Sequence, residues 1–228
     1  MTVELPDLPD ADGIEEIGRR IAAETGGFTG GGVEVFADIG RFTLRSLIDN
    51  GLRPSHRLLD LGCGALRNGF WLVRYLDADR YFGIEPSKRY VEIGMKHAIG
   101  PQLAAEKRPR FDHNREFDLA AFGERWDFVV ARSIFSHASP EQFRKAMISF
   151  RDNSGPTAVM LASYRPIPKR KADQDFIDLD PTGPEWRYNR FYSEKYLQDM
   201  ARECGVHARN YGEVFNTQMW LRVSRTDA

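Results

Sequence analysis

Apolar residues recur at helical spacing in the first fifty residues of the chain. Their spacing predicts one helix over residues 13–23 and a second, with a broad apolar face, over residues 33–50. The second helix should end at Gly51, because a glycine with a proline soon after it is a usual helix terminus. The glycine-rich stretch 26–32 between the helices is typical either of a hinge, over which the first helix closes on a ligand, or of an ordinary connector.

Beyond residue 54 the pattern becomes one of short apolar runs that alternate with amphipathic segments. The runs predict strands over residues 57–61, 81–84, 109–112, 127–131 and 157–163, and the segments between and after them predict helices over 66–76, 87–97, 140–152 and 193–203. Such alternation favours βαβ units and a largely parallel sheet. Two closing strands, 206–211 and 218–223, predict an antiparallel hairpin at one edge. Residues 164–191, rich in prolines and charges, predict a long irregular loop that is either functional or disordered.

Composition narrows the class of protein. The chain has 228 residues, 42% hydrophobic and 29% charged, which suits one large globular α/β domain. Its net charge of -1 gives no global field that attracts nucleic acid or an anionic membrane, so we expect neither as a partner. The two cysteines, Cys63 and Cys204, suggest neither a disulfide framework nor a zinc site. The acidic N-terminus does not resemble a signal peptide, and we expect a cytoplasmic protein.

The most informative segment is the turn after the first predicted strand. Gly62 and Gly64 permit a tight bend and let a ligand approach the backbone, while Asp60 lies at the carboxyl end of the strand. Glu85 follows the next strand, where an acid can accept hydrogen bonds from both hydroxyls of a ribose. A dinucleotide site would need a third glycine where this chain has Arg67, and an acid at position 60 suits a cationic ligand better than a pyrophosphate.

Three ordered motifs carry a family resemblance. They are Leu-Asp-Leu-Gly-Cys-Gly at 59–64, Gly-Ile-Glu-Pro at 83–86 and Trp-Asp-Phe-Val-Val-Ala-Arg-Ser-Ile-Phe-Ser-His at 126–137. Together they resemble the motifs of class I S-adenosylmethionine (SAM)-dependent methyltransferases, and Gly-Cys-Gly-Ala-Leu-Arg-Asn-Gly resembles a bacterial subgroup with Gly-Cys-Gly-x-Leu-Arg-x-Gly. The resemblance covers residues 55–165 and is weaker over residues 192–224.

The resemblance implies a fold and a set of roles. The fold is Rossmann-like α/β, with a mostly parallel seven-stranded sheet, an antiparallel edge hairpin and an N-terminal helical extension. Residues 1–54 would form a helical cap or lid, and residues 55–228 the methyltransferase domain, with a substrate-loop insertion at 164–191. SAM, which becomes S-adenosylhomocysteine (SAH), would contact the residues Asp60, Gly62, Gly64, Arg67, Glu85, Phe117, Asp118, Ala131 and Ser133. Within that set Glu85 would hold the ribose, and Phe117 and Asp118 would meet adenine.

His137 is the candidate catalytic base. It follows the fourth predicted strand, and an imidazole can take the proton of an acceptor hydroxyl as the oxygen attacks the methyl group. The alternative is that His137 only caps the helix that begins near Pro140. The Asn/Asp-Pro-Pro-Tyr/Phe motif of many nucleic-acid amino methyltransferases is absent from the corresponding position, so we expect a small-molecule acceptor.

The 164–191 segment shapes the hypothesis about the acceptor. Aromatic residues occur among many charged residues in this segment and directly after it. They are Tyr164, Phe176, Trp186, Tyr188, Phe191 and Tyr192. Rings and carboxylates suit a sugar or another polar metabolite, which favours O-methylation. The acids Asp175, Asp178 and Asp180 raise the alternative of a Mg²⁺ ion that acidifies the acceptor, although solvated acids are commoner and we assign no metal ligands. A homodimer is compatible with the sequence. A non-catalytic SAM-binding module and an NAD(P)-dependent oxidoreductase remain alternatives.

Overall fold

The computed structural model describes residues 9–27, 32–179, 189–214 and 217–226. Two compact units make up the chain, residues 1–113 and residues 114–228, which we call the N-terminal and C-terminal units. The fold is mixed α/β with helices at the N-terminus and mostly parallel strands, as predicted. The described residues contain nine strands, two more than the seven expected.

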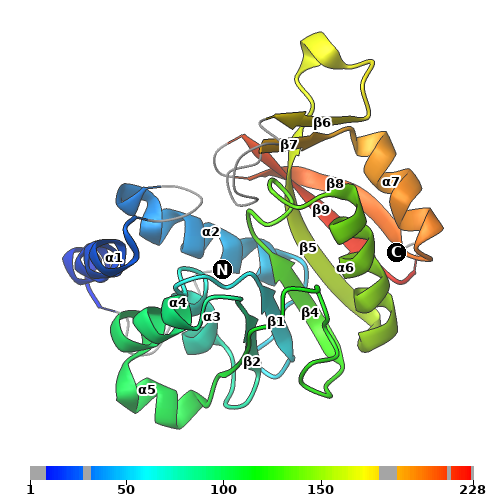
Figure 1. Ribbon diagram of the computed structural model, residues 1–228. Coiled ribbons are helices and arrows are strands. Elements are labelled where there is room, and N and C mark those ends of the chain that lie inside the picture. The colour runs from blue at the N-terminus through cyan, green and yellow to red at the C-terminus, as the bar shows by residue number, and fades with distance from the viewer. Residues whose placement is uncertain (1–8, 28–31, 180–188, 215–216, 227–228) are drawn as a thin grey trace. The chain divides into compact units, whose positions relative to one another are not determined.

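The N-terminal unit packs helices against three parallel strands (Figure 1). Strand β2 lies between β1 and β3, with Asp60 opposite Gly83 and Ile84 opposite Asp112. The elements in chain order are α1 (Ala11–Thr25), η1 (Val33–Val35), α2 (Phe36–Asp49), β1 (Leu58–Leu61), α3 (Gly69–Tyr75), β2 (Tyr81–Ile84), α4 (Lys88–Gly94), the π-helix η2 (Met95–Ile99), α5 (Gly100–Lys107) and β3 (Arg110–Asp112).

Local sequence explains the two N-terminal helices. The Asp10 side chain accepts a hydrogen bond from the backbone N–H of Gly13 and caps the start of α1, and Gly26 ends that helix in the left-handed conformation. Helix α2 approaches α3 closely because residue 40 is glycine. A Cβ atom there would lie 2.2 Å from Cδ1 of the buried Trp71. Both helices predicted for this region are therefore confirmed, and α2 is packed into the core of the unit.

Two predicted helices of this unit differ from those observed. The helix expected over residues 66–76 begins only at Gly69, because Leu66 adopts a left-handed φ of 62°, which does not fit an α-helix. The helix expected over 87–97 continues beyond α4 as a π-helix and is followed by α5, which the sequence reading missed. Helix α5 begins at Gly100, whose φ of 75° breaks the helical conformation after the π-helix, and Pro101 lies in the first turn of α5.

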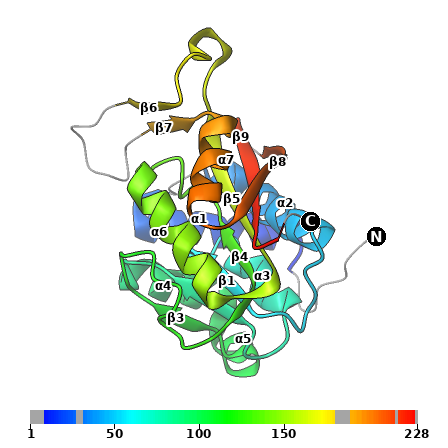
Figure 2. The ribbon, with the colours of Figure 1, turned by 90° about the vertical axis from the view of Figure 1, so that its right-hand side faces the viewer.

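The C-terminal unit is built around the long strand β5 (Figure 2). Strand β5 pairs in parallel with β4 and in antiparallel with β9, and β9 pairs in turn with β8. The predicted terminal hairpin is thus confirmed, with β8 as its outer strand. The elements are β4 (Trp126–Ala131), α6 (Pro140–Asn153), β5 (Ser154–Pro166), η3 (Lys169–Lys171), β6 (Phe176–Leu179), β7 (Asn189–Tyr192), α7 (Glu194–Glu203), β8 (His207–Val214) and β9 (Gln218–Ser224).

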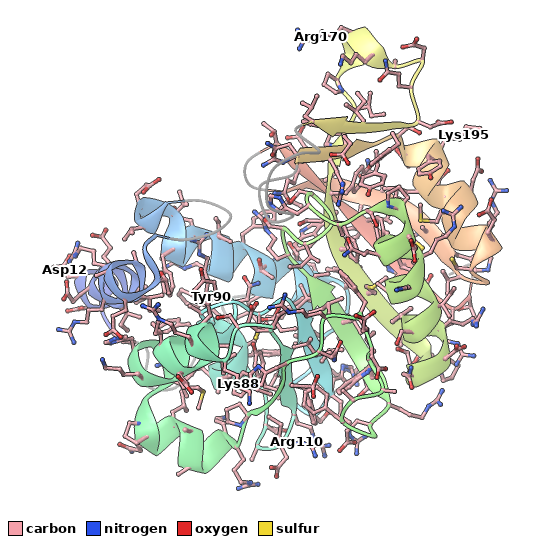
Figure 3. The ribbon with its side chains drawn as sticks, in the orientation of Figure 1. Asp12, Lys88, Tyr90, Arg110, Arg170 and Lys195 are labelled. Carbon is pink, nitrogen blue, oxygen red and sulfur yellow. The ribbon has the colours of Figure 1, made fainter. Side chains whose placement is uncertain are left out.

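The prediction of an irregular loop over residues 164–191 holds for residues 167–175 and is wrong for the other described residues of the segment, which form strands. Strand β5 continues to Pro166, and β6 and β7 form an antiparallel pair, with Ile177 opposite Phe191. Strand β7 also pairs in parallel with the end of β5. The chain between β5 and β6 projects from the rest of the unit, with Arg170 at its outer tip (Figures 1 and 3). The prolines that suggested a loop flank these short strands and do not interrupt them.

Each unit has a hydrophobic core of large buried side chains. The largest side chains with less than 2% exposure include Trp71 and Phe36 in the N-terminal unit and Trp126, Trp220 and Tyr192 in the C-terminal unit. No helix among the described residues is both long enough and apolar enough to cross a lipid bilayer.

Candidate functional site

The turn after β1 has the geometry of a ligand cradle. Gly62 and Gly64 have φ values of 75° and 54°, in the left-handed region that favours glycine. The backbone N–H groups of Gly62 and Cys63 both donate to the carbonyl of Ile84, at 2.8 and 3.1 Å, so the turn is fixed to the end of β2. Around the position that a Cβ atom of Gly64 would take, no atom lies within 4 Å. The turn is therefore held rigidly and is open at Gly64.

Asp60 is a fully buried carboxylate beside this turn. Its Oδ2 accepts a hydrogen bond of 2.9 Å from the hydroxyl of Tyr81. Its Oδ1 is buried and meets no hydrogen-bond donor among the described residues. Burial raises the pKa of Asp60 to about 7, against the hydrogen bond from Tyr81, which lowers it; the negative charge of Glu85 also raises the pKa, and the nearby side-chain amide of Asn68 lowers it. A buried acid with one unsatisfied oxygen is a strong acceptor for a cationic group.

Glu85 is held in place on several sides. One carboxylate oxygen accepts from the N–H of Gly64 at 3.1 Å, and the other accepts from the N–H of Ser87 at 2.9 Å. Its carbonyl accepts from Nδ1 of His113 at 2.7 Å. A carboxylate oxygen can accept more than one hydrogen bond, and the two oxygens of a carboxylate suit the two neighbouring hydroxyls of a ribose. Ser87 also caps α4, whose first turn carries Lys88 and Tyr90 (Figure 3).

Arg67 joins the turn to the N-terminal helices. It is 9% exposed, and burial lowers its pKa to about 10, an effect that the negative charge of Glu34 in η1 opposes. Its carbonyl oxygen lies so near α2 that a Cβ atom at Gly40 would come within 2.9 Å of it. Arg67 therefore supports the turn from the side of the N-terminal extension, and a contact with a cofactor stays a prediction.

The end of α1 is fastened to the helices that follow β2. Oε1 of Glu24 accepts from Nζ of Lys96 at 2.8 Å and contacts Nε2 of His97 at 2.7 Å. The carbonyl of Glu24 accepts from the guanidinium of Arg89 at 2.7 Å. These contacts join α1 to α4 and to the π-helix. Most of the proposed glycine hinge, residues 28–31, lies outside the described residues.

In the C-terminal unit, the two residues expected near adenine precede β4. Asp118 is exposed, and its Oδ1 accepts from the N–H of Ala120 at 2.9 Å, which shapes the local turn. Phe117 has a left-handed φ of 57° and stacks on Phe135, with ring centroids 6.2 Å apart. A strained residue in such a turn is common at binding sites, and the adenine role of both residues stays a prediction.

A polar network follows the end of β4, where Ala131 is buried and Ser133 has a left-handed φ of 61°. The N–H of Ser133 donates to Oγ of Ser163 at 2.6 Å, and Oγ of Ser163 donates to Oε1 of Gln218 at 2.6 Å. Nη1 of Arg132 donates to Oε1 of Gln218, at 3.1 Å, and to Oγ of Ser133. Sequence reasoning selected Ala131 and Ser133 but missed the other three residues. Their separation along the chain gives no signal for this contact.

Strand β7 holds the backbone around His137. The N–H of Arg190 donates to the carbonyl of Ser136 at 2.9 Å, its guanidinium donates to the carbonyl of His137, and the hydroxyl of Tyr192 donates to the carbonyl of Ala138 at 2.6 Å. Three consecutive carbonyls are thereby fixed by one short strand. The guanidinium of Arg190 also donates to Oδ2 of Asp178 on β6, at 3.0 Å.

The alternative reading of His137, as the cap of the next helix, is wrong. Ser139 caps α6. Its side chain accepts from the N–H of Gln142, and the side chain of Gln142 accepts from the N–H of Ser139, which together form a capping box. The imidazole of His137 is not needed for that purpose. Its role as base stays a prediction.

The three acids that raised the alternative of Mg²⁺ have other roles or lie outside the description. Asp178 pairs with Arg190, and Oδ1 of Asp175 accepts from the hydroxyl of Ser193 at 2.9 Å. Asp180 lies outside the described residues, as do Trp186 and Tyr188 from the aromatic set. Among the residues that the structure describes, no group of three or more potential ligands could hold a metal ion.

The comparisons with known proteins concern the fold. No family model and no curated protein matches the chain. Among solved structures, magnesium protoporphyrin IX methyltransferase from Synechocystis, with bound SAM, has 15% sequence identity and a TM-score of 0.61 over 92% of this chain and 90% of that chain. The glycopeptide N-methyltransferase MtfA complexed with SAM has 14% identity and a TM-score of 0.61 over 82% and 94%. A SAM-dependent methyltransferase from Clostridium acetobutylicum has 12% identity and a TM-score of 0.59 over 83% and 91%.

This chain has a Rossmann-like α/β fold similar to that of these methyltransferases. The likeness covers most of each chain and agrees with the Rossmann-like architecture expected from the motifs. Acidic and glycine residues gather at the carboxyl ends of β1 and β2, which is the edge where α/β sheets bind ligands. Function rests on the residues themselves.

Proposed function

We propose that this protein is a SAM-dependent methyltransferase that methylates a hydroxyl group of a small polar metabolite. The observation that carries the proposal is the buried Asp60, whose Oδ1 has no donor among the described residues, beside a turn that is open at Gly64. A carboxylate in that setting suits the ammonium and sulfonium charges of SAM and does not suit a pyrophosphate. The solved structures of similar fold with bound SAM support the same donor.

The residues of the N-terminal unit fit the parts of the donor. Asp60, Gly62 and Gly64 would lie along its methionine moiety, and Glu85 would accept hydrogen bonds from its ribose. We also assign Arg67 to the donor site; it occupies the arginine position of the bacterial Gly-Cys-Gly-x-Leu-Arg-x-Gly subgroup that the sequence resembles. In the C-terminal unit we assign Phe117 and Asp118 to adenine, and Ala131 and Ser133 to the donor and acceptor. Residues 1–54 would act as a helical cap of the 55–228 methyltransferase domain.

The chemistry requires little of the protein beyond alignment and one base. When bound, SAM supplies an electrophilic methyl group on a sulfonium, and the acceptor oxygen displaces the sulfur in line. We assign to His137 the removal of the acceptor hydroxyl proton, which moves to an imidazole nitrogen as the new C–O bond forms. The hydrogen bonds from Arg190 and Tyr192 fix the backbone that carries this imidazole. No metal ion is part of the proposal.

The acceptor is assigned from the 164–191 insertion. Phe176 and Phe191 are partly exposed on β6 and β7, and the guanidinium of Arg165 lies 5.9 Å from the centroid of the Phe191 ring. Aromatic rings beside charged groups suit a polyhydroxylated ring, so we propose a sugar or glycoside as acceptor. We also propose that the protein acts in the cytoplasm, as a monomer or a homodimer, where the buried thiols of Cys63 and Cys204 stay reduced.

Binding and turnover test the proposal separately. Isothermal titration calorimetry of the full chain with SAH should give a one-to-one complex, and absence of measurable binding would reject the donor. A panel of sugars and glycosides incubated with SAM, scored by SAH release, should identify an acceptor. His137→Ala should then lower kcat by about 100-fold or more, in the range attributed to a general base, with unchanged affinity for SAH. Unchanged turnover in that variant would remove His137 from the role of base.

A further inference from the structure

The hydroxyl of Ser133 has both of its acceptor positions in use. A serine hydroxyl offers one hydrogen to donate and two lone pairs to accept. Oγ of Ser133 accepts from Nη1 of Arg132 and from Nε2 of Gln218, the latter at 3.1 Å. Guanidinium and amide nitrogens only donate. The hydrogen of the Ser133 hydroxyl finds no acceptor within the described part of the chain, and this side chain is partly exposed, so the hydrogen can be donated to a ligand.

The other contacts of Gln218 fix the orientation of its side-chain amide. The Oε1 atom accepts from Arg132 at 3.1 Å and from the hydroxyl of Ser163 at 2.6 Å. Since a guanidinium has no lone pair to offer, the side of the amide that faces it must be the oxygen. The amide nitrogen of Gln218 therefore faces Ser133, and the direction of both hydrogen bonds to Ser133 follows.

The surrounding scaffold holds this hydroxyl rigidly. Ser133 adopts a left-handed φ of 61°, a conformation that costs a serine free energy and persists where neighbours fix it. Its N–H is bound to Oγ of Ser163 on β5, and Gln218 belongs to β9. Arg132 and Gln218 are 7% and 3% exposed, whereas Ser133 is only partly buried. A donor held in this way is preorganised for a ligand.

We propose that Ser133 and Arg132 form a recognition site for a carboxylate of a bound substrate, with the Ser133 hydroxyl as the donor that contacts it. The positive charge of Arg132 beside that hydroxyl favours an anionic oxygen over a neutral one. The site rests on the proposed methyltransferase function and adds a chemical requirement to it. The carboxylate comes either from the amino-acid part of the donor or from the methyl acceptor, and both sources offer the same oxygen atoms to Ser133.

The same hydrogen-bond assignments exclude other roles for Ser133. With both lone pairs engaged by donors, its oxygen is neither a nucleophile nor a proton acceptor. Ser133 is therefore a specificity-determining residue that selects a ligand oxygen. It does not compete with His137 for the acceptor proton.

The test uses Ser133→Gly in the full-length protein, because glycine relieves the left-handed strain while it removes the hydroxyl. The matched control is Ser224→Ala. Oγ of Ser224 also accepts from an arginine, Arg222 at 3.3 Å, but its hydrogen is already donated to the carbonyl of Thr226 at 2.8 Å. Calorimetry with SAH and with 5′-methylthioadenosine, which lacks the amino-acid carboxylate, tests the donor as the source. Two further comparisons, both made in the presence of SAH, test the acceptor as the source. Each compares the affinity for an acid with that for its alcohol partner: glucuronate with glucose, and 4-hydroxybenzoate with 4-hydroxybenzyl alcohol.

Two results support the site. If the donor supplies the carboxylate, Ser133→Gly weakens SAH about tenfold or more and leaves the affinity for 5′-methylthioadenosine unchanged. If the acceptor supplies it, SAH affinity is unchanged, the wild type prefers an acid over its alcohol partner, and Ser133→Gly loses that preference. Ser224→Ala behaves as the wild type in both cases.

Other results overturn it. The site is wrong if Ser133→Gly binds every probe as the wild type does, or if SAH and 5′-methylthioadenosine weaken equally, since the hydroxyl would then act only on the fold. A wild type that binds SAH while the variant shows no difference rejects the carboxylate site alone. A wild type that binds no SAH rejects the proposed function itself.

Discussion

The phenol of Tyr81 donates its hydrogen to Oδ2 of Asp60 across 2.9 Å, and both side chains are at most 2% exposed. Burial raises the pKa of Tyr81 well above its usual value, so the phenol stays protonated and remains a donor. One carboxylate oxygen of Asp60 is thereby satisfied by the protein, and the other is left to a ligand. Asp60 therefore lowers the stability of the folded chain when it is ionised, and it is the strongest candidate for binding a cationic group.

Asp60→Asn should make the stability of the protein less dependent on pH. The pKa of Asp60 is about 7 in the folded state and about 3.9 in an unfolded chain. Between these values the folded state keeps a proton that the unfolded state has lost, so the wild type loses stability as pH rises from about 4 to about 7. In the asparagine variant, residue 60 does not titrate and contributes no pH dependence to stability. Its stability relative to the wild type should rise with pH, by on the order of a few kcal/mol by pH 8.

Urea unfolding at pH 5.5 and pH 8 measures this difference, with Asp12→Asn, an exposed position on α1, as control (Figure 3). The same variant should bind SAH at least tenfold more weakly at pH 8, because the charge that faces the donor is gone. A wild-type stability that rises between pH 5.5 and 8 relative to the variant would contradict the assignment of a raised pKa to Asp60.

Gly64→Ala should separate folding from donor binding. A Cβ atom at this position meets no atom within 4 Å, so the folding cost is limited to the left-handed backbone strain, roughly 1–2 kcal/mol. The methyl group would lie where the proposed donor approaches, and SAH affinity should fall by more than tenfold. Gly123→Ala is the matched control, since Gly123 has φ of 67° and equally open surroundings. Thermal melts and SAH titrations of both variants check the prediction, and equal SAH affinities would contradict it.

The order of helices and strands could be predicted well because it depends on the spacing of apolar residues and glycines that are close together in sequence. Strand β2 has the predicted bounds, and Glu85 was found because it follows an apolar run at a fixed distance from Gly64. The turn after β1 also carries its own signal in its glycines. These features depend on residues close together in sequence, and the pairing of β1 with β2 then brings Asp60, Gly64 and Glu85 together.

The remaining features depend on contacts between distant residues. Arg132 and Gln218 are 86 positions apart, and nothing in either neighbourhood indicates that they share a hydrogen bond. Strands β6 and β7 are four residues each and contain charges, so their apolar pattern is too short to outweigh the prolines around them. The sequence predicts Tyr192 as an acceptor contact, whereas the structure buries it in the core, where its hydroxyl donates to the carbonyl of Ala138 beside His137.

Glu24→Gln should loosen α1. The charge of Glu24 attracts Lys96 and His97, and removal of that charge weakens the link between α1 and the helices that follow β2. If α1 acts as a lid, limited proteolysis should cut within residues 13–32 several times faster in the variant. SAH should protect the wild type more than the variant. Glu16→Gln is the control, because Glu16 pairs with Arg19 and Arg20 inside α1 alone. Equal cleavage rates in all three proteins, with and without SAH, would show that α1 is a fixed part of the fold.

Tyr192→Phe tests whether strand β7 positions the proposed base. The hydroxyl of Tyr192 is buried and donates to the carbonyl of Ala138 at 2.6 Å, next to His137. Loss of this bond leaves a buried carbonyl without that donor and should cost about 1–2 kcal/mol of stability. We expect kcat to fall about tenfold while the affinity for SAH is unchanged, since the residues assigned to the methionine and ribose of the donor are untouched.

The control for stability is Tyr75→Phe. Its hydroxyl makes the same kind of bond, to the carbonyl of Leu52 at 2.9 Å, within the N-terminal unit. Because Tyr75 is only partly buried, Tyr75→Phe should lose less stability in urea unfolding than Tyr192→Phe, and only Tyr192→Phe should lower kcat. In a His137→Ala background the kcat effect of Tyr192→Phe should disappear, because a positioning residue acts through the group that it positions. If the effect persists in that background, Tyr192 acts on turnover independently of His137, and the role of β7 as a support for the base is wrong.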